Sequence, residues 1–582
     1  MEKRAVLALV LSFLILIAFS YIGEWTRPPE TAKAPEAKAA AKPKPEAPGA
    51  PPPAKAPTPE TPAPAAPAAP ARTSREVKVE TPLFEAIFTE AGARLVSLKL
   101  KKYRQSLPSE TISQFNLWFF EFLVQRYQDP RQAQARPLEM VQVKDPRHLP
   151  LGASWQSQSL STPEDLFCEA SHAALAVKPG EEASLKFTGV TPQGLVLTRT
   201  YIFRADTYRI DMTVKVENPS DQAVPGHLAL ALTANFAGEK TGQAGTFGFQ
   251  GSINQKLRTV KPGDLKEKEV KGERPRFKPE PIPGKVDWLS MDEGYFMSAV
   301  VPLNAPATTL KVQEGPDAGL MSATLSSPEE ILAPRQASQA SYALYFGPKD
   351  LDILTALNLG LERMVNFGWL IDTILAKPML YLLKFFNRYI DNYGWSIIVL
   401  TIFLRLVFLW PNHKSYMSMK AMQRIQPRVQ EIREKYKNDR EAMNRELMAL
   451  YRAFKVNPLG GCLPMVLQVP VFIALYQVLY YAIEMRHAPF ISTLPFTNIV
   501  WLEDLSTKDP LLITPIVMGV TMFIQQKMSP TPGDPAQAKM MMFLPIVFTF
   551  LFLNFSSGLV LYWMVNNVLS IAQQHYTNKY LA

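Results

Sequence analysis

Five long apolar segments in the last third of the chain limit its possible folds more than any other feature. They span approximately residues 395–410, 463–483, 511–525, 540–554 and 558–571. Apolar runs of about 14 to 21 residues separated by polar loops are typical of helices that cross a lipid bilayer. We therefore expect residues 392–576 to form an α-helical core of five transmembrane segments in a multi-domain membrane protein.

A sixth apolar run lies near the N-terminus. Residues 5–22 carry no charge and follow Lys3 and Arg4, a pattern that predicts a transmembrane anchor over residues 1–23. The alternative is a cleaved signal peptide, but no small-x-small cleavage site follows the run. Residues 24–75 are rich in Pro, Ala, Lys and Glu, so they are expected to form a disordered linker.

Residues 76–350 have the pattern of an all-β domain. The runs 195–203 and 208–216 are separated by an Ala-Asp turn, and polar and apolar residues alternate in the second run. This alternation predicts half-buried antiparallel strands of a large β-sandwich. A helical insert is expected at residues 112–127, and the Lys-, Glu- and Pro-rich residues 256–285 are expected to form a solvated loop.

Residues 351–391 are expected to contribute an amphipathic helix that lies in the membrane interface. In residues 377–391 the charged Lys377, Lys384, Arg388 and Asp391 share one helical face, and the apolar residues lie away from it. An ordinary amphipathic helix that packs on the β-sandwich is the alternative.

The loop charges predict the topology. Residues 411–458 contain 11 Lys and Arg against 5 Asp and Glu, whereas residues 485–510 contain two basic and three acidic residues. Basic loops stay in the cytoplasm. With six spans, both termini and the short tail at residues 577–582 are therefore expected in the cytoplasm, and the β-domain outside it.

Residues 411–458 have the pattern of a cytoplasmic helical hairpin. Apolar residues recur at threes and fours on both sides of a turn at Asn438-Asp439. The net charge of 11 − 5 = +6 suits anionic lipid headgroups or ribosomal RNA, without a specific nucleic-acid sequence. A self-packed helix pair with a solvated face is the alternative.

Arg405 is the most informative single residue. It lies inside the first core span, and none of the five spans contains an Asp or Glu. A charge at this depth costs about 2.5–3.5 kcal/mol on insertion scales. One interpretation is a side chain that reaches back to the interface; the other is a hydrated groove, with Thr401 one turn earlier and Gln468 among the polar groups. Such a groove would attract acidic segments of another chain.

No motif of an enzyme or cofactor site is present. The two cysteines and six histidines show no metal-ligand spacing, and the phosphate-binding loop, the nucleophile elbow and H-E-x-x-H are all absent. We therefore expect neither a cofactor, nor a metal, nor catalysis.

Four motifs resemble those of one protein family. They are Asn-Pro-Leu-Gly-Gly-Cys-Leu-Pro at 457–464, Gly-Trp-Ser-Ile-Ile at 394–398 running on to Arg405, Gln-Gln-Lys-Met-Ser-Pro at 525–530, and Ser-Gly-Leu-Val-Leu-Tyr-Trp at 557–563. In this order they closely resemble the YidC/Oxa/Alb family of membrane protein insertases. The anchor, linker and β-domain are similar to the Gram-negative form of that family, whose periplasmic domain is a supersandwich of the sugar-epimerase type.

The resemblance implies roles for six residues. Arg405 matches the groove arginine of the family, and Thr401 and Gln468 match polar groove positions. Phe472 and Leu551 match an apolar slide for the incoming helix, to which Trp563 is assigned; Trp563 stands where some relatives carry a second tyrosine. The implied function is insertion and chaperoning of nascent membrane proteins in the cell inner membrane. The implied partners are the Sec translocon, the lipid bilayer, and the ribosome or targeting machinery at the cytoplasmic loops.

Two other classes of function fit the chain less well. A secondary transporter binds its solute between inverted repeats, and the five spans show no internal symmetry. A tethered extracytoplasmic carbohydrate enzyme would place all activity in the β-domain.

Overall fold

A computed structural model of the chain describes most of the sequence from residue 74 onward. The described residues are 74–105, 136–157, 162–163, 165–236, 247–262, 264, 281–304, 309–315, 317, 319–367, 372–454, 456, 463–496, 500–529 and 535–580. The predicted anchor, nearly all of the linker and the helical insert at 112–127 lie outside these residues, as does most of the motif at 457–464.

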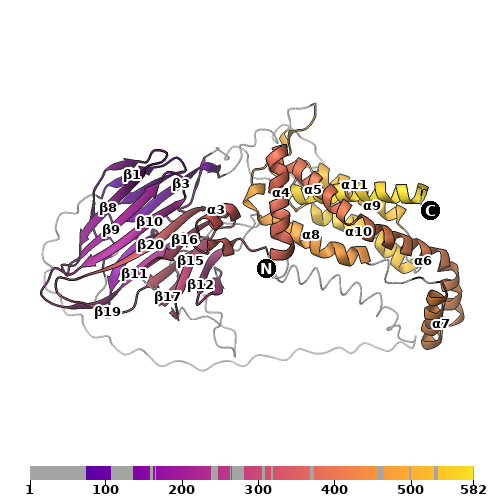
Figure 1. The fold of residues 1–582 in the computed structure, drawn as a ribbon, viewed down its shortest axis with the longest axis horizontal. Coiled ribbons are helices and arrows are strands. Elements are labelled where there is room, and N and C mark those ends of the chain that lie inside the picture. Colours follow the sequence, from indigo (N-terminus) through magenta and orange to yellow (C-terminus); the bar gives the residue numbers. More distant parts are fainter. Residues whose placement is uncertain are drawn as a thin grey trace, which may run out of the picture. The chain divides into compact units, whose positions relative to one another are not determined.

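Residues 76–348, the β-domain, form three sheets in the described part of the chain (Figure 1). The first has the order β4-β3-β2-β1-β7 and consists of β1 (Glu76–Glu80), β2 (Phe84–Thr89), β3 (Arg94–Arg104), β4 (Pro137–Glu139) and β7 (Ala174–Ala176). The largest has the order β13-β12-β15-β16-β20-β10-β9-β8-β6. Its strands are β6 (Cys168–Ala170), β8 (Glu182–Val190), β9 (Val196–Arg204), β10 (Arg209–Glu217), β12 (Gly248–Ile253), β13 (Lys256–Val260), β15 (Val286–Asp292), β16 (Phe296–Pro302) and β20 (Ala337–Pro348).

The third sheet has the order β14-β17-β18-β11-β19, and β5 pairs with β11. It consists of β5 (Gly152–Gln156), β11 (Val224–Asn235), β14 (Ile282–Pro283), β17 (Thr309–Glu314), β18 (Leu320–Ser326) and β19 (Glu330–Leu332). The loop expected at 256–285 is wrong at both ends, because residues 256–260 form β13 and residues 282–283 form β14. The exposed Lys and Arg of β13 hid the strand pattern, since an edge strand carries charge without losing its ladder.

Strands β9 and β10 pair antiparallel, as the two runs and the turn between them predict, with Ile210 opposite Phe203. Every second residue of β9 is buried, and Arg199 occupies one of these inward positions with 2% of its surface exposed. Its guanidinium is compensated by main-chain carbonyls, because it donates to the oxygens of Gly92 and Ala153. A buried arginine in this domain is therefore a structural cross-link between sheets.

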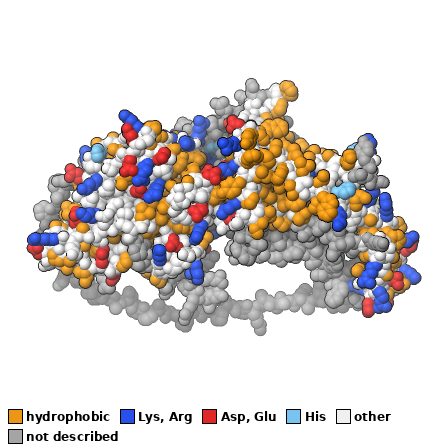
Figure 2. Space-filling view, in the orientation of Figure 1, with side chains coloured by type: hydrophobic (Ala, Val, Ile, Leu, Met, Phe, Trp, Pro, Cys, Tyr) orange, Lys and Arg blue, Asp and Glu red, His pale blue; other side chains and the backbone are white. Residues whose placement is uncertain are grey.

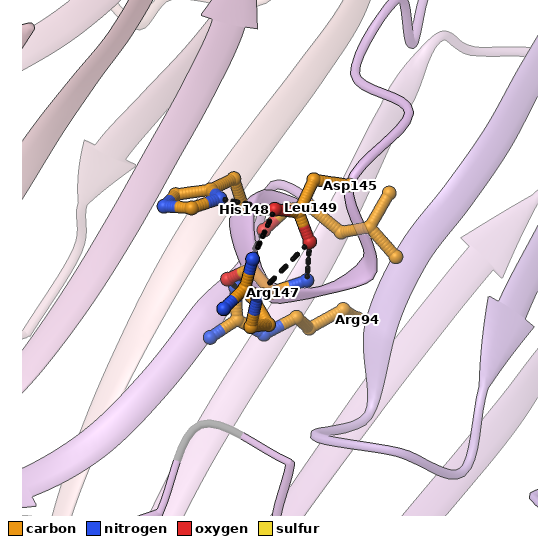
Figure 3. A network of polar contacts seen from close by, with 5 residues as sticks. All are labelled: Arg94, Asp145, Arg147, His148 and Leu149. Atoms are coloured by element: carbon orange, nitrogen blue, oxygen red, sulfur yellow. Dashed lines mark hydrogen bonds and ion pairs between the residues drawn. The ribbon is translucent and has the colours of Figure 1, made fainter. Parts of the chain in front are cut away.

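A compact polar network closes the turn after β4 (Figure 3). Arg94 Nη1 donates to the carbonyl oxygens of Arg147 and Leu149 at 2.6 and 3.0 Å, and Arg147 Nη2 donates to Asp145 Oδ2 at 3.0 Å. The hydrogen bonds from Arg147 hold the pKa of the Asp145 carboxyl below its usual range. Of the five residues drawn in Figure 3, all but Arg94 lie within one short turn. The network therefore fixes that turn against β3 and is not a catalytic constellation.

From residue 351 onward the described residues form helices and connecting loops, with one short hairpin of β21 (Ile491–Thr493) and β22 (Val500–Leu502). The α-helices are α3 (Leu351–Ala356), α4 (Lys377–Ile390), α5 (Tyr393–Val407), α6 (Leu409–Lys435), α7 (Arg440–Ala453), α8 (Leu463–Tyr481), α9 (Ile513–Met528), α10 (Pro535–Phe552) and α11 (Ser557–Tyr580). Shorter helical turns cover Leu361–Met364, Asp372–Ala376 and Ile483–Met485. The β-rich region followed by a helical region confirms the coarse fold prediction.

Three boundaries differ from those expected. The interval 351–391 is not one helix but α3, two short turns and α4, because Gly360 adopts a left-handed conformation with φ 75° that interrupts the path. The first core segment breaks at Phe408, where α5 and α6 meet at 61°. Helix α11 continues to Tyr580 through most of the expected tail.

Helices α6 and α7 form the predicted hairpin, with Asp439 as the N-cap of α7. Its oxygen Oδ1 accepts a hydrogen bond from the Ala442 amide at 3.0 Å. Ile425, Val429 and Leu447 form the buried centre between the two helices. The apolar side chains of both helices are thus buried between them, and the basic side chains lie on the outer surface of the hairpin.

Taken singly, no helix in the described residues has both the length and the apolar character needed to cross a membrane, and α5 with α6 passes such a test only as a bent pair.

Helix α4 turns its lysines inward and its aromatic rings outward. Lys377 Nζ lies 2.9 Å from Asp372 Oδ2, while Tyr381, Phe385 and Tyr389 recur every four residues with 50%, 53% and 75% of their surface exposed. A surface helix in water has the opposite arrangement. This arrangement suits an apolar or interfacial surrounding on the outer side of α4.

Lys384 of α4 is the centre of an ionic cluster, called the Lys384 cluster. Its ammonium lies 2.5 Å from Asp352 Oδ2, 2.9 Å from Glu484 Oε1 and 3.7 Å from Asp350 Oδ1. The carboxylates come from α3 and from the turn after α8, so one cation joins three separate segments. Burial raises the pKa of Glu484, against the effect of the ammonium. Burial alone would lower the pKa of Lys384, but the surrounding carboxylates raise it.

The loop after α8 contacts the β-domain directly. Arg486 Nη2 donates to the carbonyl oxygens of Arg104 and Gln105 at 2.7 and 3.1 Å, and its guanidinium lies 5.1 Å from the ring centre of Phe296. The neighbouring His487 is one-fifth exposed, with Nε2 3.9 Å from Asp504 Oδ2. Burial, together with the adjacent Arg486 charge, lowers the pKa of His487 to about 4.

Candidate functional site

A polar pocket opens among helices α5, α6, α8 and α11. It encloses about 250 Å³ of space outside the protein atoms, part of which is open solvent. Its lining residues are Thr401, Leu404, Arg405, Phe408, Asn412, Gln468, Val471, Tyr562 and Asn566. The structure therefore brings Arg405, Thr401 and Gln468, the three residues assigned to the groove, to one site.

Arg405 lies in the last turn of α5 and points toward α11. Its Nη2 donates to Gln573 Oε1 at 2.7 Å, and its Nε is buried without a hydrogen-bond partner. In the described part of the chain no carboxylate forms an ion pair with this guanidinium. The positive charge is thus held in place by a neutral amide but is not neutralised.

The other two predicted groove residues have local partners. Thr401 is buried, and its hydroxyl donates to the Ile397 carbonyl at 2.6 Å within α5. Gln468 Nε2 donates to the Tyr562 hydroxyl at 3.4 Å. The Thr401 hydroxyl is therefore bonded within α5, whereas Gln468 and Tyr562 join α8 to α11 across the pocket.

The residues assigned to the apolar slide divide into two places. Phe472 and Trp563 meet edge to face with ring centres 4.8 Å apart, and Phe552 lies 5.2 Å from Trp563. Leu551 is next to Phe552 on α10 but on another face, with 46% of its surface exposed. The aromatic pair is part of the helical core, and Leu551 belongs to its outer surface.

Two polar residues of the pocket, Asn412 and Tyr562, and the partner of Arg405, Gln573, were not singled out from the sequence. A signal for two of them was present, because residues 562, 566 and 573 are spaced by four and seven and so share one face of α11. Asn412 gave no such signal, since the bend at Phe408 is what turns α6 toward the pocket.

Apolar side chains cover the outside of the helical core. Figure 2 shows them gathered over the helices, whereas charged side chains are scattered over the β-domain and the hairpin. The exposed residues of α5, α9 and α10 include Ile402, Leu406, Val520, Phe543, Val547 and Phe550. Exposed apolar area of this extent marks a surface that contacts lipid or other proteins.

Within the described residues, no three His, Cys, Asp or Glu side chains are grouped to hold a metal ion.

A large β-domain, followed by helices with an apolar exterior and a polar pocket, defines a membrane protein with a substantial domain outside the bilayer. The family described as "60Kd inner membrane protein" matches residues 385–582, and the family described as "YidC periplasmic domain" matches residues 120–382. The first match lies within the helical region, and the second covers most of the β-domain and continues into α4.

Full-length relatives identify the family. The membrane protein insertase YidC of Syntrophus aciditrophicus is 39% identical over 589 residues, which cover all of both chains. The membrane protein insertase YidC of Citrifermentans bemidjiense is 41% identical over 585 residues, again covering all of both chains. The chain therefore belongs to the YidC family of membrane protein insertases, as the sequence motifs predicted.

One solved structure, an active YidC insertase with its first transmembrane domain, is 16% identical and covers 87% of this chain and 94% of its own, with a TM-score of 0.34.

Proposed function

We propose that the pocket around Arg405 receives polar or acidic segments of a nascent membrane protein while its apolar segment passes into lipid. Arg405, Thr401 and Gln468 bind the polar segment, and Phe472, Trp563 and Leu551 lie along the path of the apolar one. The observation that carries this proposal is the Arg405 guanidinium, which has a neutral amide partner and one buried N–H group without an acceptor. A cation in such a pocket attracts carboxylates.

Short helices add to the effect. Helices α5 and α9 contain 15 and 16 residues. At 1.5 Å per residue they span about 22–24 Å, against a hydrocarbon thickness of about 30 Å. A bilayer that thins around them would shorten the apolar barrier for a polar segment. Burial of the client's apolar segment in lipid then supplies the driving force.

We further propose an orientation of the chain in the membrane and a set of partners. The β-domain, of supersandwich type, faces the periplasm, and α4 lies in the membrane interface between it and a five-span core at residues 392–576. The hairpin at 411–458 and both termini face the cytoplasm, supported by the excess of 11 basic over 5 acidic residues in the hairpin. This charge suits contact with the ribosome or targeting machinery, and the chain acts alone or with the Sec translocon.

The β-domain is not proposed to be an enzyme, and the relatives found by sequence are insertases. A tethered carbohydrate enzyme would lose its activity when residues 85–340 are deleted. An insertase core that retains Asp350 and Asp352 is expected to keep most of its insertion activity. A transporter would instead give solute flux in vesicles that contain the purified protein.

The pocket is tested by reconstituting the purified full chain in liposomes with a small client that carries either an acidic or an uncharged leading segment. Arg405→Ala is expected to slow insertion of the acidic client about tenfold, by loss of a charged hydrogen bond. Arg405→Lys should retain much of the rate, and Arg445→Ala, on the exposed side of α7, is the matched control. Full activity of Arg405→Ala on the acidic client would refute the groove.

A further inference from the structure

In this structure the side chain of Gln573 accepts a hydrogen bond from Arg405. The two residues are 168 positions apart, on α5 and α11, and the hydrogen bond between Arg405 Nη2 and Gln573 Oε1 measures 2.7 Å. The spacing of residues 562, 566 and 573 on α11 places Gln573 on the same face as Tyr562 and Asn566, which line the pocket. Gln573 therefore lies about two helical turns beyond these pocket residues on α11, where it meets the Arg405 side chain.

The contact differs in strength from the one that a client would make. A neutral amide oxygen makes a weaker hydrogen bond to a guanidinium than a carboxylate does, and a carboxylate can also accept from two N–H groups at once. The buried Nε of Arg405 has no acceptor in this structure, so a carboxylate that displaces the amide gains a second contact if it reaches Nε as well. An incoming carboxylate thus gains by replacing the amide, while the amide keeps the guanidinium oriented when no client is bound.

We propose that Gln573 is a positioning residue of the groove: it holds the Arg405 guanidinium toward α11 in the empty state and is displaced by the acidic group of the client. This inference rests on the groove function proposed above. The choice of an amide is what makes the exchange possible, because a resident carboxylate would compete with the client and an apolar residue would leave the guanidinium without an acceptor.

The adjacent Gln574 provides a matched control. Its Nε2 donates to Ser529 Oγ at 3.2 Å, so it faces α9 and not Arg405. A glutamate at either position adds the same charge at nearly the same depth in α11, but only a glutamate at 573 can hold Arg405 permanently.

The experiment compares wild type, Gln573→Glu, Gln574→Glu and Arg405→Ala in liposomes, with the rate of insertion measured against client concentration. For the acidic client, Gln573→Glu is expected to raise the half-saturating concentration about tenfold with the maximal rate within about twofold of wild type, as expected when a charged hydrogen bond replaces a neutral one. The uncharged client should be unaffected. A folding defect would instead lower the maximal rate for both clients.

The outcomes separate the two proposals. If Arg405→Ala is impaired on the acidic client while Gln573→Glu behaves like wild type or like Gln574→Glu, the role of Gln573 is refuted and the groove stands. Equal impairment of both clients by Gln573→Glu also refutes it. If Arg405→Ala itself is fully active, the groove fails first, and Gln573 has no client to make way for.

Discussion

Replacing Lys384 by methionine should destabilise the junction of α3, α4 and α8 by an amount that depends strongly on pH. The substitution keeps the length of the side chain but leaves Glu484, whose side chain is 8% exposed, without its cation. A buried carboxylate without a partner is either kept charged at high cost or protonated.

Protonation limits the cost. From the ordinary pKa of 4.5, neutralising Glu484 at pH 7 requires 2.5 pH units at 1.36 kcal/mol each, or about 3 kcal/mol. At pH 5 the same step requires about 0.7 kcal/mol. In the variant, the folded-state pKa of Glu484 is raised further, so stability is lost as the pH rises from 4.5 toward the folded value. Lys384→Met should thus be weakened by about 3 kcal/mol at pH 7 and much less at pH 5.

The assay is denaturant unfolding of the purified full chain in detergent at both pH values, with amide hydrogen exchange in α3 and α4 to locate the opening. Lys384→Met/Glu484→Gln should recover most of the loss, because the buried charge is gone. Arg335→Met, which breaks an ion pair with Asp221 whose side chains are 80% and 86% exposed, should cost less than about 1 kcal/mol. Equal losses at pH 7 and pH 5, or no recovery in the double variant, would refute the reasoning.

Three further predictions concern other parts of the chain. The pKa of His487 is lowered from 6.5 to about 4, so the folded state should lose about 2 kcal/mol of stability as the pH falls from 7 to 5. His487→Gln should abolish this dependence in hydrogen exchange of the loop. A Cβ at Gly519 would lie 2.1 Å from Thr549 Oγ1, so Gly519→Ala should cost about 1–3 kcal/mol in thermal unfolding, and Thr549→Ala should restore part of it. Asp439→Ala removes the N-cap of α7 and should lower the free energy of opening of that helix by about 1 kcal/mol, measured as faster amide exchange.

Each of these three predictions would be contradicted by a specific result. A pH profile of the His487→Gln loop that matches wild type would assign the acid sensitivity to another group. Additive losses in the Gly519→Ala/Thr549→Ala variant would mean that the two helices separate and do not clash. Unchanged exchange in α7 after Asp439→Ala would show that packing in the hairpin, and not the cap, determines the opening of that helix.

Local patterns were enough to predict the elements that depend on their own residues. Two runs separated by a turn located β9 and β10, the second by its alternation, and the apolar stripes at threes and fours located both helices of the hairpin. Apolar length placed α8, α9 and α10 within a few residues. In each of these cases the burial of one face decides the structure, and that face is visible in the sequence.

Features that depend on two distant segments could not be predicted in this way. The charged face of α4 was visible in the sequence, but the carboxylates at residues 352 and 484 that surround Lys384 are brought near it only by the fold. Likewise, the lack of an acid in the spans was visible, whereas the neutral partner of Arg405 on α11 was not. The order of strands in the three sheets also depends on pairings that no local pattern encodes.

The inverted faces of α4 affect how the protein can be divided for study. A cut after Pro348 would leave the Lys384 cluster whole in the helical fragment, whereas a cut after Ala356 would remove Asp350 and Asp352 and leave Lys384 paired with Glu484 alone. Extending the soluble fragment to Ile390 would expose Tyr381, Phe385 and Tyr389 to water. The boundary that keeps the Lys384 cluster whole therefore lies before Asp350, and a soluble fragment that extends to Ile390 should aggregate more readily than one that ends there.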